Sequence, residues 1–140
     1  MNVPLLKARV LAVDDDEGFL ASLCRSLEVS FERVDCVESI DEAWRRLESD
    51  DYDLILLEVL FDNEPGGLEM CRRVKADARW RDTPLVFVSD ADLMYGMSLK
   101  SYLGQDSAVP ADGFIDKLEG CDEIAKRVRS ILEKPVPDEV

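Results

Sequence analysis

The stretch Val10-Leu11-Ala12-Val13-Asp14-Asp15-Asp16 decides the fold, because four apolar residues run directly into three acids. Four further short apolar runs lie at residues 34–37, 54–57, 85–88 and 113–115. Three of the five runs are apolar throughout, which is typical of strands that are covered on both faces of a sheet. Because patterns of helical spacing alternate with the runs, the sequence predicts a parallel α/β sheet with right-handed crossover connections.

Four segments outside these runs carry apolar residues three or four positions apart, as amphipathic helices do. In chain order they hold Leu20, Leu23, Cys24 and Leu27; Ala43, Trp44 and Leu47; Cys71, Val74 and Ala78; and Ile124, Val128, Ile131 and Leu132. Ser39 and Glu42 form a capping box for the second segment, and the third helix is predicted to begin near Gly67. Between Ser89 and Phe114, glycine and proline interrupt the pattern, so we expect the fourth helix to be short or irregular.

The length of 140 residues predicts a single domain, which we assign to residues 1–134. Residues 135–140 form a polar, proline-containing tail or the start of a linker. The formal net charge is −14, so no direct binding to nucleic acid or to an anionic membrane surface is expected. No apolar run approaches the roughly 18 residues of a membrane span. We therefore expect a cytoplasmic protein.

The chain contains no histidine. This excludes a histidine-ligated zinc site, a histidine-activated nucleophile and a phosphohistidine within the chain. Its four cysteines lie in apolar or helical contexts and form no C-x-x-C pair: Cys24, Cys36, Cys71 and Cys121. We interpret them as buried thiols in a reducing compartment.

Polar residues follow the predicted strands at their carboxyl ends, where open α/β sheets bind ligands. They are Asp14 and Asp15 after the first strand, Glu58 after the third, Ser89 after the fourth and Lys117 after the fifth. Two like charges ~4 Å apart repel by about 4 kcal/mol at an effective dielectric of 20, so converging carboxylates need a cation. Mg²⁺ prefers oxygen ligands and is the expected metal, with Asp14, Asp15 and Glu58 as its candidate ligands, while Lys117 offers a fixed counter-charge. A simpler interpretation is that the acids after the first strand cap the following helix.

Five segments, in this order, resemble the receiver domain of two-component response regulators. They read VLAVDDD at 10–16, YDLILLEV at 52–59, GLE at 67–69, PLVFVS at 84–89 and ADGFIDK at 111–117. The resemblance covers about residues 8–133. It implies a flavodoxin-like, doubly wound sheet of five parallel strands in the order 2-1-3-4-5, with helices on both faces. It also implies a signalling module of a two-component or phosphorelay system rather than an enzyme.

In such domains a partner histidine kinase donates a phosphoryl group to an aspartate at the end of the third strand. Mg²⁺ is held by that aspartate and by one acid of a pair on the first strand. A hydroxyl and a lysine bind phosphoryl oxygens, and an aromatic residue on the fifth strand changes rotamer. The resemblance implies that Asp14 and Asp15 are the acidic pair, Glu58 the acceptor position, Ser89 the switch hydroxyl, Phe114 the switch aromatic residue and Lys117 the phosphate-binding lysine.

The sequence departs from this family at the acceptor position, where Glu58 stands instead of aspartate. Glutamate is one methylene longer, and a misplacement of ~1 Å can cost in-line transfer about 10²-fold, so we expect no efficient phosphorylation. Leu118 follows Lys117 where the family usually has proline, and a cis bond there would cost ~2.5–4 kcal/mol and is not expected. The loop at residues 60–66 is one residue longer than usual, and the segment from Ser89 to Phe114 is longer too.

Two hypotheses follow from Glu58. In the first, its carboxylate imitates the phosphorylated aspartate by reaching Lys117 or Ser89, and the domain is fixed in one signalling state. In the second, the pocket is degenerate and the domain is a constitutive interaction module. The sequence slightly favours the second, because a carboxylate has one negative charge where a phosphoryl group has nearly two. Both predict a stand-alone module that acts through a sensor histidine kinase, a downstream signalling protein or a second copy of itself.

Two alternatives remain open at this point. The first is a conventional receiver that is phosphorylated at Glu58 or at the nearby Asp62. The second belongs to a different class, the phosphohydrolases of the haloacid dehalogenase type, whose first motif resembles Asp14-x-Asp16. The chain is short for that class, and the spacing of Glu58 and Lys117 fits a receiver better.

Overall fold

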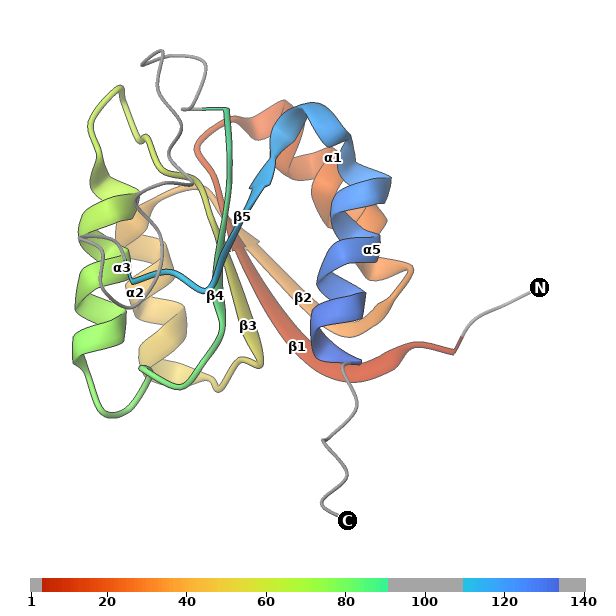
Figure 1. Ribbon diagram of the computed structural model, residues 1–140, viewed down its shortest axis with the longest axis horizontal. Helices are drawn as coiled ribbons and strands as arrows, with labels where there is room; N and C mark the ends of the chain where they lie inside the picture. Colours follow the sequence, from red (N-terminus) through yellow and green to blue (C-terminus); the bar gives the residue numbers. More distant parts are fainter. Residues whose placement is uncertain (1–3, 91–109, 134–140) are drawn as a thin grey trace.

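The computed structural model describes residues 4–90 and 110–133, which form a sheet between two layers of helices (Figure 1). In chain order the elements are β1 (Leu6–Val13), α1 (Glu17–Glu28), β2 (Phe31–Val37), α2 (Ile40–Ser49), β3 (Leu54–Leu57), α3 (Gly66–Ala76), β4 (Leu85–Ser89), β5 (Gly113–Asp116), the 3-10 helix η2 (Lys117–Glu119) and α5 (Cys121–Leu132). The strands pair in the order β2-β1-β3-β4-β5, and every pair is parallel, which confirms the predicted sheet. None of the helices in these two ranges is long and apolar enough to cross a membrane.

Helices α1 and α5 cover one face of the sheet, and α2 and α3 cover the other (Figure 1). Because side chains alternate along a strand, β1 directs Val10 and Ala12 toward α1 and α5. Leu11 and Val13 point toward α2 and α3. All four side chains are buried, as are the apolar residues of β3 and β4. This two-sided burial explains why these three runs contain no polar residue.

Two strands begin earlier than the apolar runs predict. β1 begins at Leu6 and β2 at Phe31, and these two residues pair before an irregularity that ends at Arg9. Lys7 and Arg9 interrupt the apolar pattern in this part of β1, where one side of the strand meets solvent. The fourth helix that we expect before Phe114 falls on residues 91–109 and lies outside the described residues, as does the tail at 135–140.

Helix α3 begins at Gly66, one residue before the predicted start, and lies very close to the segment after β3. A Cβ atom on Gly67 would lie 1.9 Å from the backbone oxygen of Glu58. The Gly67 amide also donates a hydrogen bond of 2.9 Å to the Val59 carbonyl. Only glycine fits this approach, and it fixes the start of α3 against the backbone of Glu58.

The prediction that all four cysteines are buried is right only for Cys71, which lies on the core-facing side of α3. Burial raises the pKa of this thiol to about 11. Cys24, Cys36 and Cys121 are only partly buried, which corrects the prediction. For Cys36 the reason is that it lies on β2, an edge strand that has a neighbour on one side only. All four thiols are free.

Candidate functional site

The carboxyl ends of the strands bring four of the predicted site residues together. Asp14 follows β1, Glu58 follows β3, Ser89 ends β4 and Lys117 follows β5. The exposed fractions of Asp14, Glu58 and Ser89 are 3%, 5% and 0%, so these polar groups are withdrawn from solvent. Buried polar and charged groups are tolerated only when they are paired, and this site pairs them with one another.

The Glu58 carboxylate lies at the centre of the site and accepts from four donors. Its Oε1 atom lies 2.8 Å from the Lys117 ammonium. Its Oε2 atom accepts a hydrogen bond from the Ser89 hydroxyl. The same Oε2 atom accepts from the backbone amides of Val59 at 2.6 Å and Leu60 at 3.1 Å. The carboxylate thus folds back over its own backbone and also reaches the ends of β4 and β5.

The Lys117 ammonium bridges the two buried acids. It lies 2.9 Å from Asp14 Oδ2 and 2.8 Å from Glu58 Oε1. It also stands over the Phe19 ring, 4.4 Å from the ring centroid, in a cation–π contact. Burial acts to lower the pKa of Lys117, but its contacts with the two acids outweigh burial and raise it. Lys117 therefore stays charged in the site.

Burial of Asp14 opposes the ionisation of its carboxyl group. Burial raises its pKa to about 6, against the lowering effects of the Asp16 amide and of Lys117. The Asp16 amide donates to Asp14 Oδ1 at 2.9 Å, so both oxygens of this carboxylate have donors. Asp14 therefore loses its proton only as the pH rises through about 6.

The other two predicted site residues have contacts of their own: Asp15 with the loop after β3, and Phe114 with the core. Asp15 is exposed, and its Oδ2 accepts from the Asp62 amide at 3.1 Å, which holds the loop after β3. Asp62 and Asn63 in this loop have positive φ angles of 54° and 62°. Phe114 is partly buried and packs against the core beneath α2 and α3. The peptide bond between Lys117 and Leu118 is not cis, as expected without proline.

Residues 10–129 match the response regulator receiver domain family. The chain belongs to this family. The response regulator MprA of Mycolicibacterium vanbaalenii is 28% identical over 134 residues, which are 96% of this chain and 54% of that protein. MprA of Mycobacterium leprae is 29% identical over 131 residues, which are 94% of this chain and 54% of that protein. The chain thus spans about half the length of these curated relatives.

Solved structures support the receiver fold. A sensor protein from Polaromonas sp. JS666 superposes with a TM-score of 0.73 at 19% identity, over 91% of this chain and 98% of that chain. The phosphorylated cyanobacterial phytochrome response regulator RcpA gives a TM-score of 0.67 at 20% identity, over 95% of this chain and 100% of that chain. Receiver domains are signalling modules, generally not enzymes, and they interact with histidine kinases and downstream proteins.

Receiver domains typically bind Mg²⁺ in the acceptor site, and the residues of this receiver do not fit that ion as they are arranged. The three predicted ligands do not converge, because Asp15 points to the loop while Asp14 and Glu58 share Lys117. Within residues 4–90 and 110–133, no three acidic or cysteine side chains are grouped closely enough to hold a metal ion. Each unit of positive charge ~4 Å from the ammonium would add about 4 kcal/mol of repulsion at an effective dielectric of 20.

Two backbone donors in the site could not be predicted from the residue types. The amides of Val59 and Leu60 bind Glu58 regardless of their side chains, so residue types give no signal for them. The one indirect signal is Gly67, which allows α3 to hold this turn in place. The sequence does predict a helix start near Gly67, but it gives no sign that this glycine supports the two amides.

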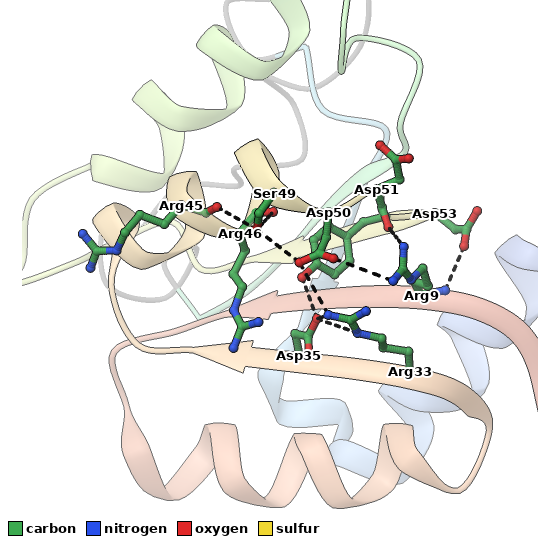
Figure 2. A network of polar contacts seen from close by, with 10 residues as sticks. Arg9, Arg33, Asp35, Arg45, Arg46, Ser49, Asp50, Asp51 and Asp53 are labelled. Carbon is green, nitrogen blue, oxygen red and sulfur yellow. Dashed lines mark hydrogen bonds and ion pairs between the residues drawn. The ribbon is translucent and has the colours of Figure 1, made fainter.

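A second polar network, at the amino end of β3, was also missed (Figure 2). Asp35 on β2 accepts from the Tyr52 hydroxyl at 2.6 Å and pairs with Arg33 at 3.1 Å. Asp50 pairs with Arg33 at 3.5 Å and with Arg9 at 3.7 Å. Burial acts to raise the pKa of Asp35, but the hydrogen bonds from Tyr52 and Arg33 outweigh it and lower that pKa. The network joins β1, β2 and the turn before β3, at the end of β3 opposite to Glu58.

Proposed function

We propose that this receiver is a signalling module that works without phosphorylation, because the Glu58 carboxylate occupies the position of a phosphoryl group. It acts by binding a protein partner, either a sensor histidine kinase or a downstream signalling protein. The observation that supports this most strongly is the contact of one carboxylate with both Ser89 and Lys117. These are the residues that the family resemblance assigns to phosphoryl binding.

The same contacts argue against a conventional phosphoacceptor. A nucleophilic oxygen must face the phosphodonor, whereas Oε1 faces Lys117 and Oε2 is bound by three other donors. An attacking oxygen would have to leave these contacts before an in-line approach. Since a misplacement of ~1 Å can cost about 10²-fold in rate, efficient transfer to Glu58 is not expected.

The Glu58 carboxylate has less negative charge than a phosphoryl group, but it makes contacts with several donors. A carboxylate has one negative charge, and a phosphoryl group has about 1.5 to 2. Against this, Glu58 engages the hydroxyl, the ammonium and two backbone amides at once. Phe114 packs against the core rather than being fully exposed. We therefore favour a domain held in one signalling state over a pocket without order, which reverses the slight preference from the sequence.

The test is incubation of the full chain with Mg²⁺ and a small-molecule phosphodonor, followed by intact mass measurement. The wild type should gain no phosphoryl mass. Glu58→Asp should gain one phosphoryl group, because the shorter side chain frees the acceptor oxygen from Ser89 and Lys117. Glu58→Gln is the matched control without an acceptor carboxylate and should gain none. A phosphoryl group on wild-type Glu58 would refute the proposal, and peptide mapping would separate it from one on Asp62.

The phosphohydrolase alternative loses support from the position of Asp16. Its side chain caps α1 by accepting from the Phe19 amide at 3.1 Å, and the residue is exposed. It therefore does not point toward Glu58 and Lys117, as the second acid of that motif would have to. Hydrolysis of a generic phosphate ester by the wild type, and its loss in Asp14→Asn, would restore this alternative.

A further inference from the structure

We infer that the Lys117 ammonium replaces the divalent cation of this receiver, so that the pocket is complete without Mg²⁺. The inference rests on the proposed function, in which Glu58 fills the phosphoryl position. It goes further by naming a residue of the chain as the permanent counter-ion of the acid cluster.

The first support is the position of the ammonium between the two buried acids. It lies 2.9 Å from Asp14 and 2.8 Å from Glu58, which are the two strand-end acids that a metal would have to bridge. The face of Phe19 forms a third side of its environment, at 4.4 Å. A lysine ammonium has three N–H donors on a flexible side chain, so it can bind carboxylate oxygens and make a cation–π contact with a ring at the same time.

The second support is that the backbone around Lys117 is fixed. Lys117 begins the short helix η2, and the Asp116 side chain caps this helix by accepting from the Leu118 amide at 2.9 Å. Gly120 ends it with a φ of 91°. The lysine therefore starts from a defined turn rather than from an open loop.

The third support is that the other acid of the first strand is used elsewhere. Asp15 binds the Asp62 amide in the loop after β3. Asp14 and Glu58 have donors on all four of their oxygens, counting the Asp16 amide and the donors to Glu58. A divalent ion would have to displace the ammonium and also break hydrogen bonds that the chain already makes.

The test is a titration of the full chain with Mn²⁺, followed by electron paramagnetic resonance of the free ion. The wild type should bind no stoichiometric Mn²⁺ at low millimolar concentrations. Lys117→Met keeps the length of the side chain and removes its charge, and it should bind Mn²⁺ at least about tenfold more tightly than the wild type. Adding Asp14→Asn to Lys117→Met removes one acid and should abolish the gained binding. Stoichiometric binding by the wild type that Asp14→Asn removes would overturn the inference, as would a folded Lys117→Met with no gain.

A second measurement covers the case in which Lys117→Met does not fold. The melting temperature of the wild type should be the same in MgCl₂ and in NaCl of equal ionic strength, since a ligand stabilises only a chain that binds it. A rise specific to Mg²⁺ that Asp14→Asn abolishes would overturn the inference. The two proposals fail separately: phosphoryl uptake on Glu58 refutes the proposed function, while metal binding without phosphoryl uptake refutes only the internal counter-ion.

Discussion

Replacing Gly67 by alanine tests how α3 positions Glu58. The new Cβ atom would lie 1.9 Å from the Glu58 carbonyl oxygen, so the helix and the turn must separate by at least about 1 Å. Overpacking of this kind costs about 1–3 kcal/mol. Weakening of the hydrogen bond from the Gly67 amide to Val59 adds about 0.5–1.5 kcal/mol. We therefore expect a loss of about 1.5–4.5 kcal/mol in the free energy of unfolding.

The adjacent glycine is the matched control. A Cβ atom on Gly66 would meet only side-chain atoms of Ile40 and Phe61, at 3.7–3.8 Å, which is ordinary contact. Gly66→Ala should change the free energy of unfolding by no more than about 1 kcal/mol. Urea denaturation of the wild type and both variants measures the difference. Equal stabilities for the two variants would refute the argument that close approach, rather than helix propensity, requires glycine at Gly67.

Three further predictions concern ionic contacts, and urea denaturation measures each of them. The pKa of Asp14 is about 6 in the folded chain and about 3.8 in the unfolded chain, so the folded chain binds a proton more readily and its stability falls as the pH rises from about 4 to 6. Asp14→Asn should remove this fall. It should therefore raise the free energy of unfolding by about 1–3 kcal/mol near pH 7.5 and change it little near pH 4. A gain that does not depend on pH would contradict the assignment. Tyr52→Phe should lower the free energy of unfolding by about 1.5–3 kcal/mol, because the Asp35 carboxylate loses a hydrogen-bond donor. The pKa of Asp35 is lowered in the fold, so its carboxylate stabilises the fold at neutral pH and this stabilisation is lost in acid. The cost of the substitution should therefore shrink in acid, and a constant cost would contradict the prediction. Lys75→Met should cost about 1–3 kcal/mol, because the ammonium is mostly buried and bonds the Arg81 and Thr83 carbonyls at 3.1 and 2.7 Å, and a neutral result would show that these carbonyls find other donors.

Much of the fold follows from the sequence because burial on two faces leaves a plain pattern. The runs at 54–57 and 85–88, in β3 and β4, contain no polar residue, and both strands have a neighbour on each side. The early parts of β1 and β2 could not be predicted in the same way, because the polar residues Lys7, Arg9 and Glu32 stand next to the buried residues Ala8 and Phe31 there. Edge strands and strand ends need only one apolar face, so the apolar run understates their length.

The sequence predicts which residues lie close together in the site, but it does not predict the contacts that their side chains make. The rule that parallel strands end at one edge is enough to place Asp14, Glu58, Ser89 and Lys117 side by side. It does not say that Asp15 turns to the loop, because neighbouring residues at a strand end point in different directions. Nor does it show that the ammonium of Lys117 bridges two acids, since that depends on side-chain conformations and on the turn of η2.

Under the proposed function, the contacts of Glu58 have a consequence for how long a signal lasts. A phosphoryl group on an aspartate is added by one protein, is lost by hydrolysis, and gives each activated molecule a lifetime. The Glu58 carboxylate is part of the chain, so its contacts with Ser89 and Lys117 are renewed whenever the protein folds and no phosphatase can end them. Under the proposed function, a cell can change the output of this receiver only through the rates at which the protein is made, degraded and captured by its partner.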